Sequence, residues 1–171
     1  MKTLCGIRGG QIHPMIKKND SFDSKLSVWE FNQMIYDIPY FNTDFFNGYK
    51  GGILSEGDYA FICGNRSNSG QKVLFLFDQS YFDKVNVRED VTEQMRILPS
   101  LIQNPNHNGE KIISQVLIHC DGSEGGWSNG CQTIYPDYWN NFIDLFHINE
   151  KGIYSLRRQS GWIAPDYFQG N

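Results

Sequence analysis

Short stretches of alternating apolar and polar residues, and short clusters of β-branched and aromatic residues, recur along the chain. They predict strands at residues 4–8, 26–36, 59–63, 73–77, 112–120 and 152–157. A loop rich in Gly, Asn and Ser separates residues 59–63 from 73–77, which is typical of a hairpin with a long loop. The strand predicted at 112–120 carries His119 near its end.

The period of the pattern changes after residue 131. Pro136 suits the first position of a helix, and Asp137 places a carboxylate in its first turn. Four apolar residues then follow at helical spacing: Trp139, Phe142, Ile143 and Phe146. Residues 90–103 are ambiguous, because they contain helix-forming residues but the segment is closed by Pro99 and Pro105. We therefore expect a mostly β fold (α+β) with one or two peripheral helices, as a β-sandwich or a β-barrel.

Length and charge narrow the class of protein. The chain has 171 residues, which fits a single domain spanning 1–171. Fifteen basic and 19 acidic residues are well mixed and give a net charge of −4, so a nucleic-acid partner is not expected. No apolar run is long enough to span a membrane, and the first ten residues do not resemble a secretory signal.

The four cysteines are Cys5, Cys63, Cys120 and Cys131. A chain of this size does not need disulfides for stability, and the spacing matches no familiar disulfide framework. Free thiols are therefore favoured over one or two disulfides.

The most informative segment runs from residue 119 to 134. It places His119 and Cys131 twelve positions apart, at the two ends of a loop rich in Gly and Ser. A thiol becomes a working nucleophile when a neighbouring base takes its proton. Gly130, directly before the cysteine, suits a turn whose backbone N–H groups face a developing oxyanion.

These residues carry a resemblance to a known family. Ile118-His119, a glycine-rich loop and then Ser128-Asn129-Gly130-Cys131 resemble the catalytic signature of the L,D-transpeptidase catalytic domain, whose members act on bacterial peptidoglycan. Gln132 after the cysteine and Trp139 in the following helix are similar to a narrower branch found in phage and secreted bacterial proteins. The close match covers about thirty residues.

The resemblance implies roles for individual residues. Cys131 would attack a peptide carbonyl, His119 would act as its base, and Gly130 would contribute to the oxyanion hole. Ser128 would fix the turn or hydrogen-bond the histidine or the substrate. The candidate substrate-binding residues are Trp127, Asn129 and Asp121, and Asp121 is also a candidate for orienting the histidine. No cofactor and no metal are expected.

The chain departs from the common family pattern at three positions. The family has histidine where this chain has Asn129, and a small apolar residue followed by arginine or asparagine where it has Gln132 and Thr133. In the family this arginine is thought to help hold the donor stem peptide. The candidates to replace it are Arg8, Arg157 and Arg158.

The resemblance predicts a cysteine enzyme acting on peptidoglycan stem peptides as a transpeptidase, carboxypeptidase or endopeptidase. Without a signal peptide, it would reach the periplasm or cell wall by non-classical export as an antibacterial effector, or by release as a phage lysis factor. A secretion or immunity protein would then be a partner.

Three alternatives stay open. One is a non-catalytic module of the same fold that binds the cell wall or belongs to a phage particle. Another is a cysteine acyl-transfer enzyme for a cytoplasmic amide. A zinc site made of His119, Cys120 and Cys131 is disfavoured, because adjacent strand residues point to opposite faces and Cys120 then belongs to the core.

Overall fold

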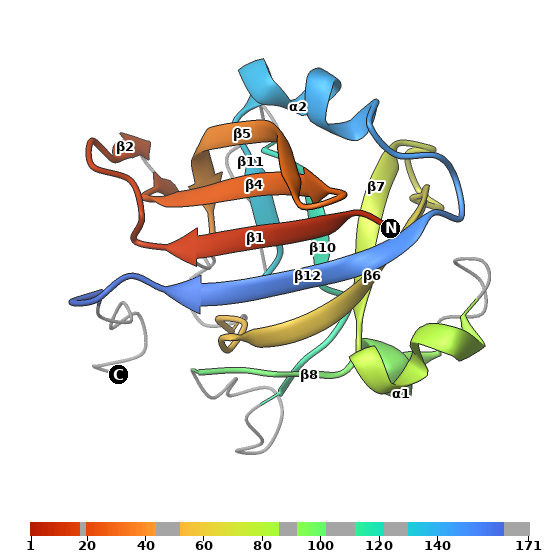
Figure 1. The fold of residues 1–171 in the computed structure, drawn as a ribbon. Coiled ribbons are helices and arrows are strands. Elements are labelled where there is room, and N and C mark those ends of the chain that lie inside the picture. Colours follow the sequence, from red (N-terminus) through yellow and green to blue (C-terminus); the bar gives the residue numbers. More distant parts are fainter. Residues whose placement is uncertain (18–19, 44–51, 86–91, 102–111, 122–129, 163–171) are drawn as a thin grey trace.

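The computed structural model describes residues 1–17, 20–43, 52–85, 92–101, 112–121 and 130–162. Eight strands form a closed barrel: β1 (Thr3–Arg8), β4 (Ser24–Glu30), β5 (Gln33–Asn42), β6 (Gly57–Asn65), β7 (Lys72–Phe77), β10 (Leu117–Cys120), β11 (Gln132–Ile134) and β12 (Lys151–Arg158). Their order around the barrel is β1, β12, β6, β7, β10, β11, β5 and β4 (Figure 1). The neighbours β1–β12 and β10–β11 are parallel, and the other neighbours are antiparallel.

Smaller elements surround the barrel. Two short antiparallel pairs are formed by β2 (Met15–Lys17) with β3 (Asp20–Phe22) and by β8 (Leu98–Pro99) with β9 (Ile112–Ile113). The helical elements are the 3-10 helix η1 (Gln79–Lys84), α1 (Glu93–Arg96) and α2 (Pro136–Ile143). No helix in the described ranges is both long and apolar enough to cross a membrane.

The mostly β class is confirmed, and so are several elements. The strands predicted at 4–8 and 152–157 are β1 and β12, and the predicted hairpin is the antiparallel pair of β6 and β7. The predicted helix is α2, with Pro136 in its first turn. Residues 90–103, which the sequence left ambiguous, contain both α1 and β8.

Two strand predictions were wrong in their extent. Residues 26–36 are not one strand, because Phe31 and Asn32 turn the chain from β4 into β5 with φ values of 50° and 61°. Residues 112–120 are divided into β9 and β10 by a break at Gln115, whose φ is 58°. Neither break contains a glycine or a proline, so neither carries a strong turn signal in the sequence.

The barrel interior is the main hydrophobic core. All eight strands contribute buried side chains to it, for example Leu4 from β1 and Tyr154 from β12. The apolar side of α2 packs against the same core through Phe142 and, just beyond the helix, Phe146, whose ring meets that of Phe61 edge-on at 5.5 Å. Figure 1 shows α2 lying above β5 and β11.

A second apolar cluster lies on the outer face of the barrel. Its buried members come from β6, β7 and β10 and from the end of η1: Ala60, Ile62, Val73, Phe75, Phe77, Val85 and Leu117. Cys131 and Trp139 pack at its margin. This outer face, not the barrel interior, therefore carries the candidate nucleophile.

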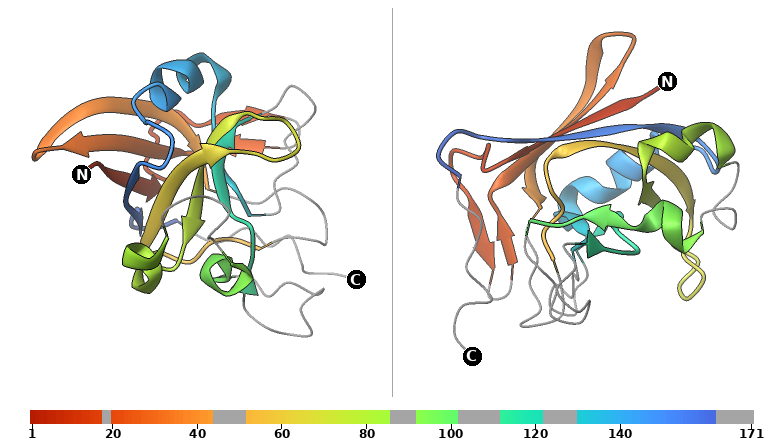
Figure 2. Two further views of the ribbon diagram at one scale, coloured as in Figure 1. Left: turned by 90° about the vertical axis from the view of Figure 1, so that its right-hand side faces the viewer. Right: turned by 90° about the horizontal axis from the view of Figure 1, so that it is seen from below.

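The β4–β5 hairpin projects beyond the rest of the barrel (Figure 2). Its turn exposes 86% of Phe31, and Met34 is also exposed. The hairpin end is therefore a separate surface from the face that carries Cys131.

Candidate functional site

The register of β10 and β11 brings His119 and Cys131 to one face of the sheet. Ile118 pairs with Gln132, and His119 pairs with Thr133. Ile118 and Gln132 are fully buried on the interior side. Because successive side chains alternate between faces, His119, Cys131 and Thr133 share the outer face.

The sulfur of Cys131 lies against the chain that leads into β10. Its Sγ accepts a hydrogen bond from the Leu117 N–H at 3.4 Å and lies 3.8 Å from the Gln115 carbonyl oxygen, to which the thiol donates. Burial raises the pKa of the Cys131 thiol, while the Leu117 N–H and the charge of Arg66 act in the opposite direction. The net shift is upward, so Cys131 is a neutral thiol at rest.

His119 is held by a backbone carbonyl. Its Nδ1 lies 2.7 Å from the carbonyl oxygen of Cys120. A carbonyl only accepts hydrogen bonds, so Nδ1 carries the proton in the neutral ring and Nε2 is left as the basic nitrogen. Burial lowers the pKa of His119, and the charge of Arg66 adds to this; the Cys120 carbonyl and the Asp121 charge partly oppose it. The ring is therefore a neutral base.

Gly130 occupies a position that requires glycine. Its φ is +116°, and a Cβ there would lie 2.9 Å from the carbonyl oxygen of Gly52 and 3.2 Å from Cδ1 of Ile113. Any larger residue would displace the backbone that enters β11 directly before Cys131.

Gln132 holds the backbone beside Cys131 from inside the barrel, a role that the sequence did not indicate. Its Oε1 accepts a hydrogen bond from the Tyr154 hydroxyl at 3.0 Å, and its Nε2 donates to the Gly130 carbonyl at 3.3 Å. Gln132 and Tyr154 are both fully buried. The residues on either side of Cys131 are thus tied to β12 across the core.

Arg66 is the second residue that sequence reasoning missed. It follows β6 by one residue and lies two positions beyond Gly64, so it continues the outer face beside the end of β10. Its charge lowers the pKa of both Cys131 and His119. Only the spatial pairing of β6, β7 and β10 reveals this proximity.

The three arginines expected to replace the family arginine are all engaged in ion pairs. Arg8 is fully buried and bonded to Glu56 at 2.8 Å, and Arg158 contacts the same carboxylate at 2.8 Å. Arg157 pairs with Asp58 at 2.7 Å.

The other predicted residues are placed as follows. Asp121 is only 4% exposed at the end of β10, and the nearest partner of the His119 Nδ1 is the Cys120 carbonyl rather than this carboxylate. Cys120 is half-buried and its thiol donates to the Asp121 carbonyl at 3.4 Å, so it is not in the core as expected. Ser128, Trp127 and Asn129 lie outside the described residues.

All four cysteines are free thiols. Within the described ranges, no group of three or more His, Cys, Asp or Glu side chains is arranged to hold a metal ion. The hydroxyl of Thr133, the register partner of His119, is buried and has no hydrogen-bond partner in the part of the chain that is described.

Comparison of the chain with protein-family models, with curated proteins and with solved structures finds no match in any of the three. The geometry of the site and the resemblance of residues 118–139 are therefore the features of this chain that point to a function.

Proposed function

We propose that this protein is a cysteine acyl-transfer enzyme acting on the stem peptides of bacterial peptidoglycan, with an L,D-transpeptidase-like barrel. The observation that supports the chemistry most directly is the shared outer face of Cys131 and His119. The Cys120 carbonyl occupies Nδ1 of the histidine and leaves Nε2 available as a base. The choice of peptidoglycan rests on the resemblance of the cysteine motif.

The proposed reaction has two halves. His119 Nε2 takes the thiol proton while Sγ of Cys131 attacks the peptide carbonyl; a C–S bond forms and the C–N bond breaks. The imidazolium returns that proton to the leaving amine. Water or an acceptor amine then attacks the thioester, again with His119 as base, and releases an acid or a new amide together with the thiol.

Burial raises the pKa of Cys131 and lowers that of His119, which favours the neutral forms of both groups as the starting state of the proposed reaction. Gly130, with φ of +116°, is the proposed donor of an oxyanion N–H together with Cys131.

The proposed place of action is the periplasm or the cell wall. Delivery by an export machine would make the protein an antibacterial effector with an immunity partner, and release during infection would make it a phage lysis factor. Expression behind a periplasmic leader tests the place of action without either route, because a wall-directed enzyme is expected to round or lyse the host cell.

The enzymatic proposal is tested with purified stem peptides and mass spectrometry. Wild type is expected to release or exchange terminal residues and to accumulate an acyl adduct on Cys131. Cys131→Ala and His119→Ala are expected to abolish turnover, whereas Cys5→Ala, which alters another half-buried thiol, is expected to retain it. Unchanged turnover in Cys131→Ala would overturn the proposal.

One observation favours a second candidate, a non-catalytic wall-binding module. Burial and the raised pKa of Cys131 are also typical of an inert thiol. This candidate predicts that wild type binds sacculi without turnover and that Cys131→Ala binds them equally well.

A further inference from the structure

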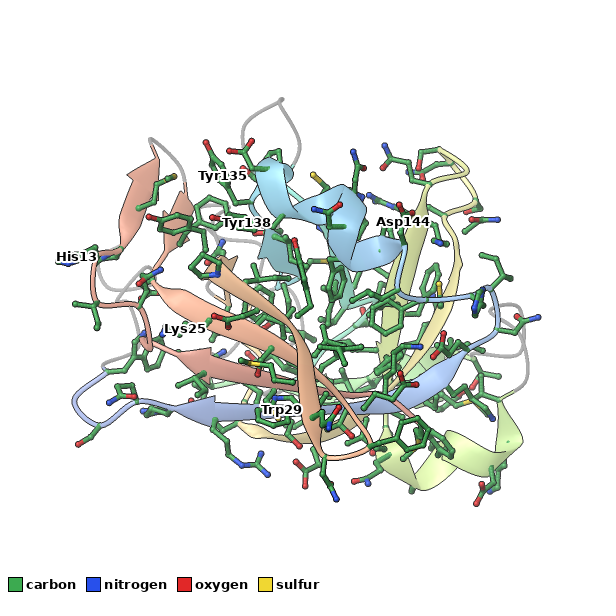
Figure 3. The ribbon with its side chains drawn as sticks, turned by 45° about the horizontal axis from the view of Figure 1, so that its top comes forward. His13, Lys25, Trp29, Tyr135, Tyr138 and Asp144 are labelled. Carbon is green, nitrogen blue, oxygen red and sulfur yellow. The ribbon has the colours of Figure 1, made fainter. Side chains whose placement is uncertain are left out.

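Four half-buried tyrosines gather where β5 meets the start of α2. We call Tyr36, Tyr40, Tyr135 and Tyr138 the tyrosine cluster. The ring centroid of Tyr40 lies 6.1 Å from that of Tyr135 and 6.2 Å from that of Tyr138. Figure 3 shows Tyr135 and Tyr138 close together at the start of α2 and well away from Trp29 on the projecting hairpin.

Two members of the tyrosine cluster, Tyr135 and Tyr40, continue the face that carries Cys131, while Tyr36 and Tyr138 also pack against the main core. Tyr135 follows Cys131 by four residues, and its N–H donates to the Tyr40 carbonyl, which extends the pairing of β11 with β5. By strand alternation Cys131, Thr133 and Tyr135 point to the same side. At a rise of about 3.3 Å per residue, Tyr135 lies about 13 Å from Cys131 along the strand.

The cluster combines ring surface with polar groups. Tyr36 donates to the backbone carbonyl of Tyr138 at 3.4 Å, while the hydroxyls of Tyr40 and Tyr138 have no hydrogen-bond partner in the described part of the chain. Burial raises the pKa of Tyr138, as do, in decreasing order, the neighbouring Tyr40, Asp137, Tyr36 and Tyr135. The phenol groups therefore lie near one another and can bind a ligand.

The charge and the rigidity of the tyrosine cluster restrict the class of ligand that it could bind. Residues 36–40 and 135–138 contain two aspartates and no lysine or arginine, which disfavours a phosphate or an anionic lipid surface. Pro39 and Pro136 fix the backbone beside the rings, so little conformational entropy is lost on binding. A neutral ligand with apolar faces and many hydroxyls, a polysaccharide, fits these properties.

We propose that the tyrosine cluster binds the glycan strand of peptidoglycan and presents its attached stem peptide to Cys131. This inference rests on the proposed function. The separation is suitable, because an extended peptide of about four residues covers roughly the same 13 Å. The bound glycan would thus position the substrate, and the acyl transfer would take place at Cys131, several residues along the stem peptide from the glycan.

The test measures binding to soluble glycan strands from which the stem peptides have been removed. In the full chain carrying Cys131→Ala we expect saturable binding. Adding Tyr40→Ala or Tyr138→Ala is expected to weaken it roughly tenfold, the effect of losing one stacking ring. Tyr138→Phe, which keeps the ring, is expected to lose less. Phe31→Ala, an exposed aromatic on the projecting hairpin, serves as the matched control and should bind like the parent.

These experiments distinguish a failure of the glycan-binding inference from a failure of the proposed catalytic function. No binding to glycan strands, or equal binding by parent and tyrosine variants with unchanged melting temperatures, would overturn the inference. Turnover of free stem peptides by wild type tests only the proposed chemistry. Tyr138→Ala should keep that turnover and lose the preference for glycan-linked stems.

Discussion

The buried pair of Gln132 and Tyr154 offers a quantitative test of how the backbone beside Cys131 is positioned. Gln132→Leu removes the acceptor of the Tyr154 hydroxyl, which is fully buried and bonded at 3.0 Å. Leaving that hydroxyl without an acceptor should lower the free energy of unfolding by about 1–3 kcal/mol. Tyr154→Phe should cost a similar amount, because it leaves Oε1 of the glutamine without its donor.

The double variant Gln132→Leu/Tyr154→Phe is the decisive measurement. It removes both polar groups, so its loss should be smaller than the sum of the single losses by about 1–2 kcal/mol. Urea unfolding of the four proteins gives the coupling free energy. Additive losses would refute the claim that the two side chains are bonded across the core. If they are bonded, the rate at which Cys131 is alkylated should also change in Gln132→Leu. In that variant the Gly130 carbonyl, directly before Cys131, loses its side-chain donor.

Four further outcomes follow from the same structure. The alkylation rate of Cys131 by a neutral electrophile should keep rising above the ordinary thiol range, because burial raises its pKa; a plateau in mildly acidic buffer would contradict this. Arg66→Gln should move that profile to still higher pH by removing a nearby positive charge, while Arg157→Gln, at a distant ion pair, should leave it unchanged. Burial alone would raise the pKa of Glu56, yet hydrogen bonds from arginines and from its own amide hold it at about 2. Its stabilising contribution is therefore present at neutral pH and lost as the pH falls from 4.5 towards 2, and Glu56→Gln should flatten that part of the acid unfolding curve. Phe31→Asn should raise the free energy of unfolding by up to about 1 kcal/mol, because a bulky residue at a φ of 50° is strained; a lower urea midpoint would argue against strain at this turn.

The parts of the fold that the sequence predicted are those with regular local patterns. The segment 73–77 and the helical spacing from Trp139 to Phe142 are dense in apolar residues and mark β7 and α2. Closure into a barrel depends instead on pairings between distant segments, such as β1 with β12. Nothing local indicates such a pairing, so the sequence left barrel and sandwich open.

The turn between β4 and β5 shows why one strand was predicted where two occur. A two-residue turn with both φ values positive normally contains Asn-Gly or Gly, and this one is Phe31-Asn32. Apolar residues occur on both sides of the turn, yet the projecting hairpin leaves Met34 and Ile35 exposed, so their apolar character does not mark a core-facing strand.

The sequence could predict those residues of the candidate site that lie together in one segment of the chain. Cys131, His119 and Gly130 belong to a single motif, and the structure places the first two on one face. Arg66 and Tyr40 come from segments far away in the chain and carry no motif of their own. Gln132 belongs to the motif, but its bond to Tyr154 crosses the barrel interior.

In the proposed enzyme, the barrel would position Cys131 and His119 separately from the groups that recognise the substrate. The inward-facing neighbours Gln132 and Ile118 are fully buried, so the two strands that lead to Cys131 and His119 are fixed from inside the barrel. The imidazole orientation comes from a backbone carbonyl, which no side-chain substitution removes directly. Burial favours the neutral forms of both Cys131 and His119, so the proposed reaction would start from a neutral thiol rather than from a standing thiolate. In the proposed enzyme, groups on the outer face would bind the rest of the substrate and set its selectivity, so a surface such as the tyrosine cluster could change without disturbing the proposed chemistry.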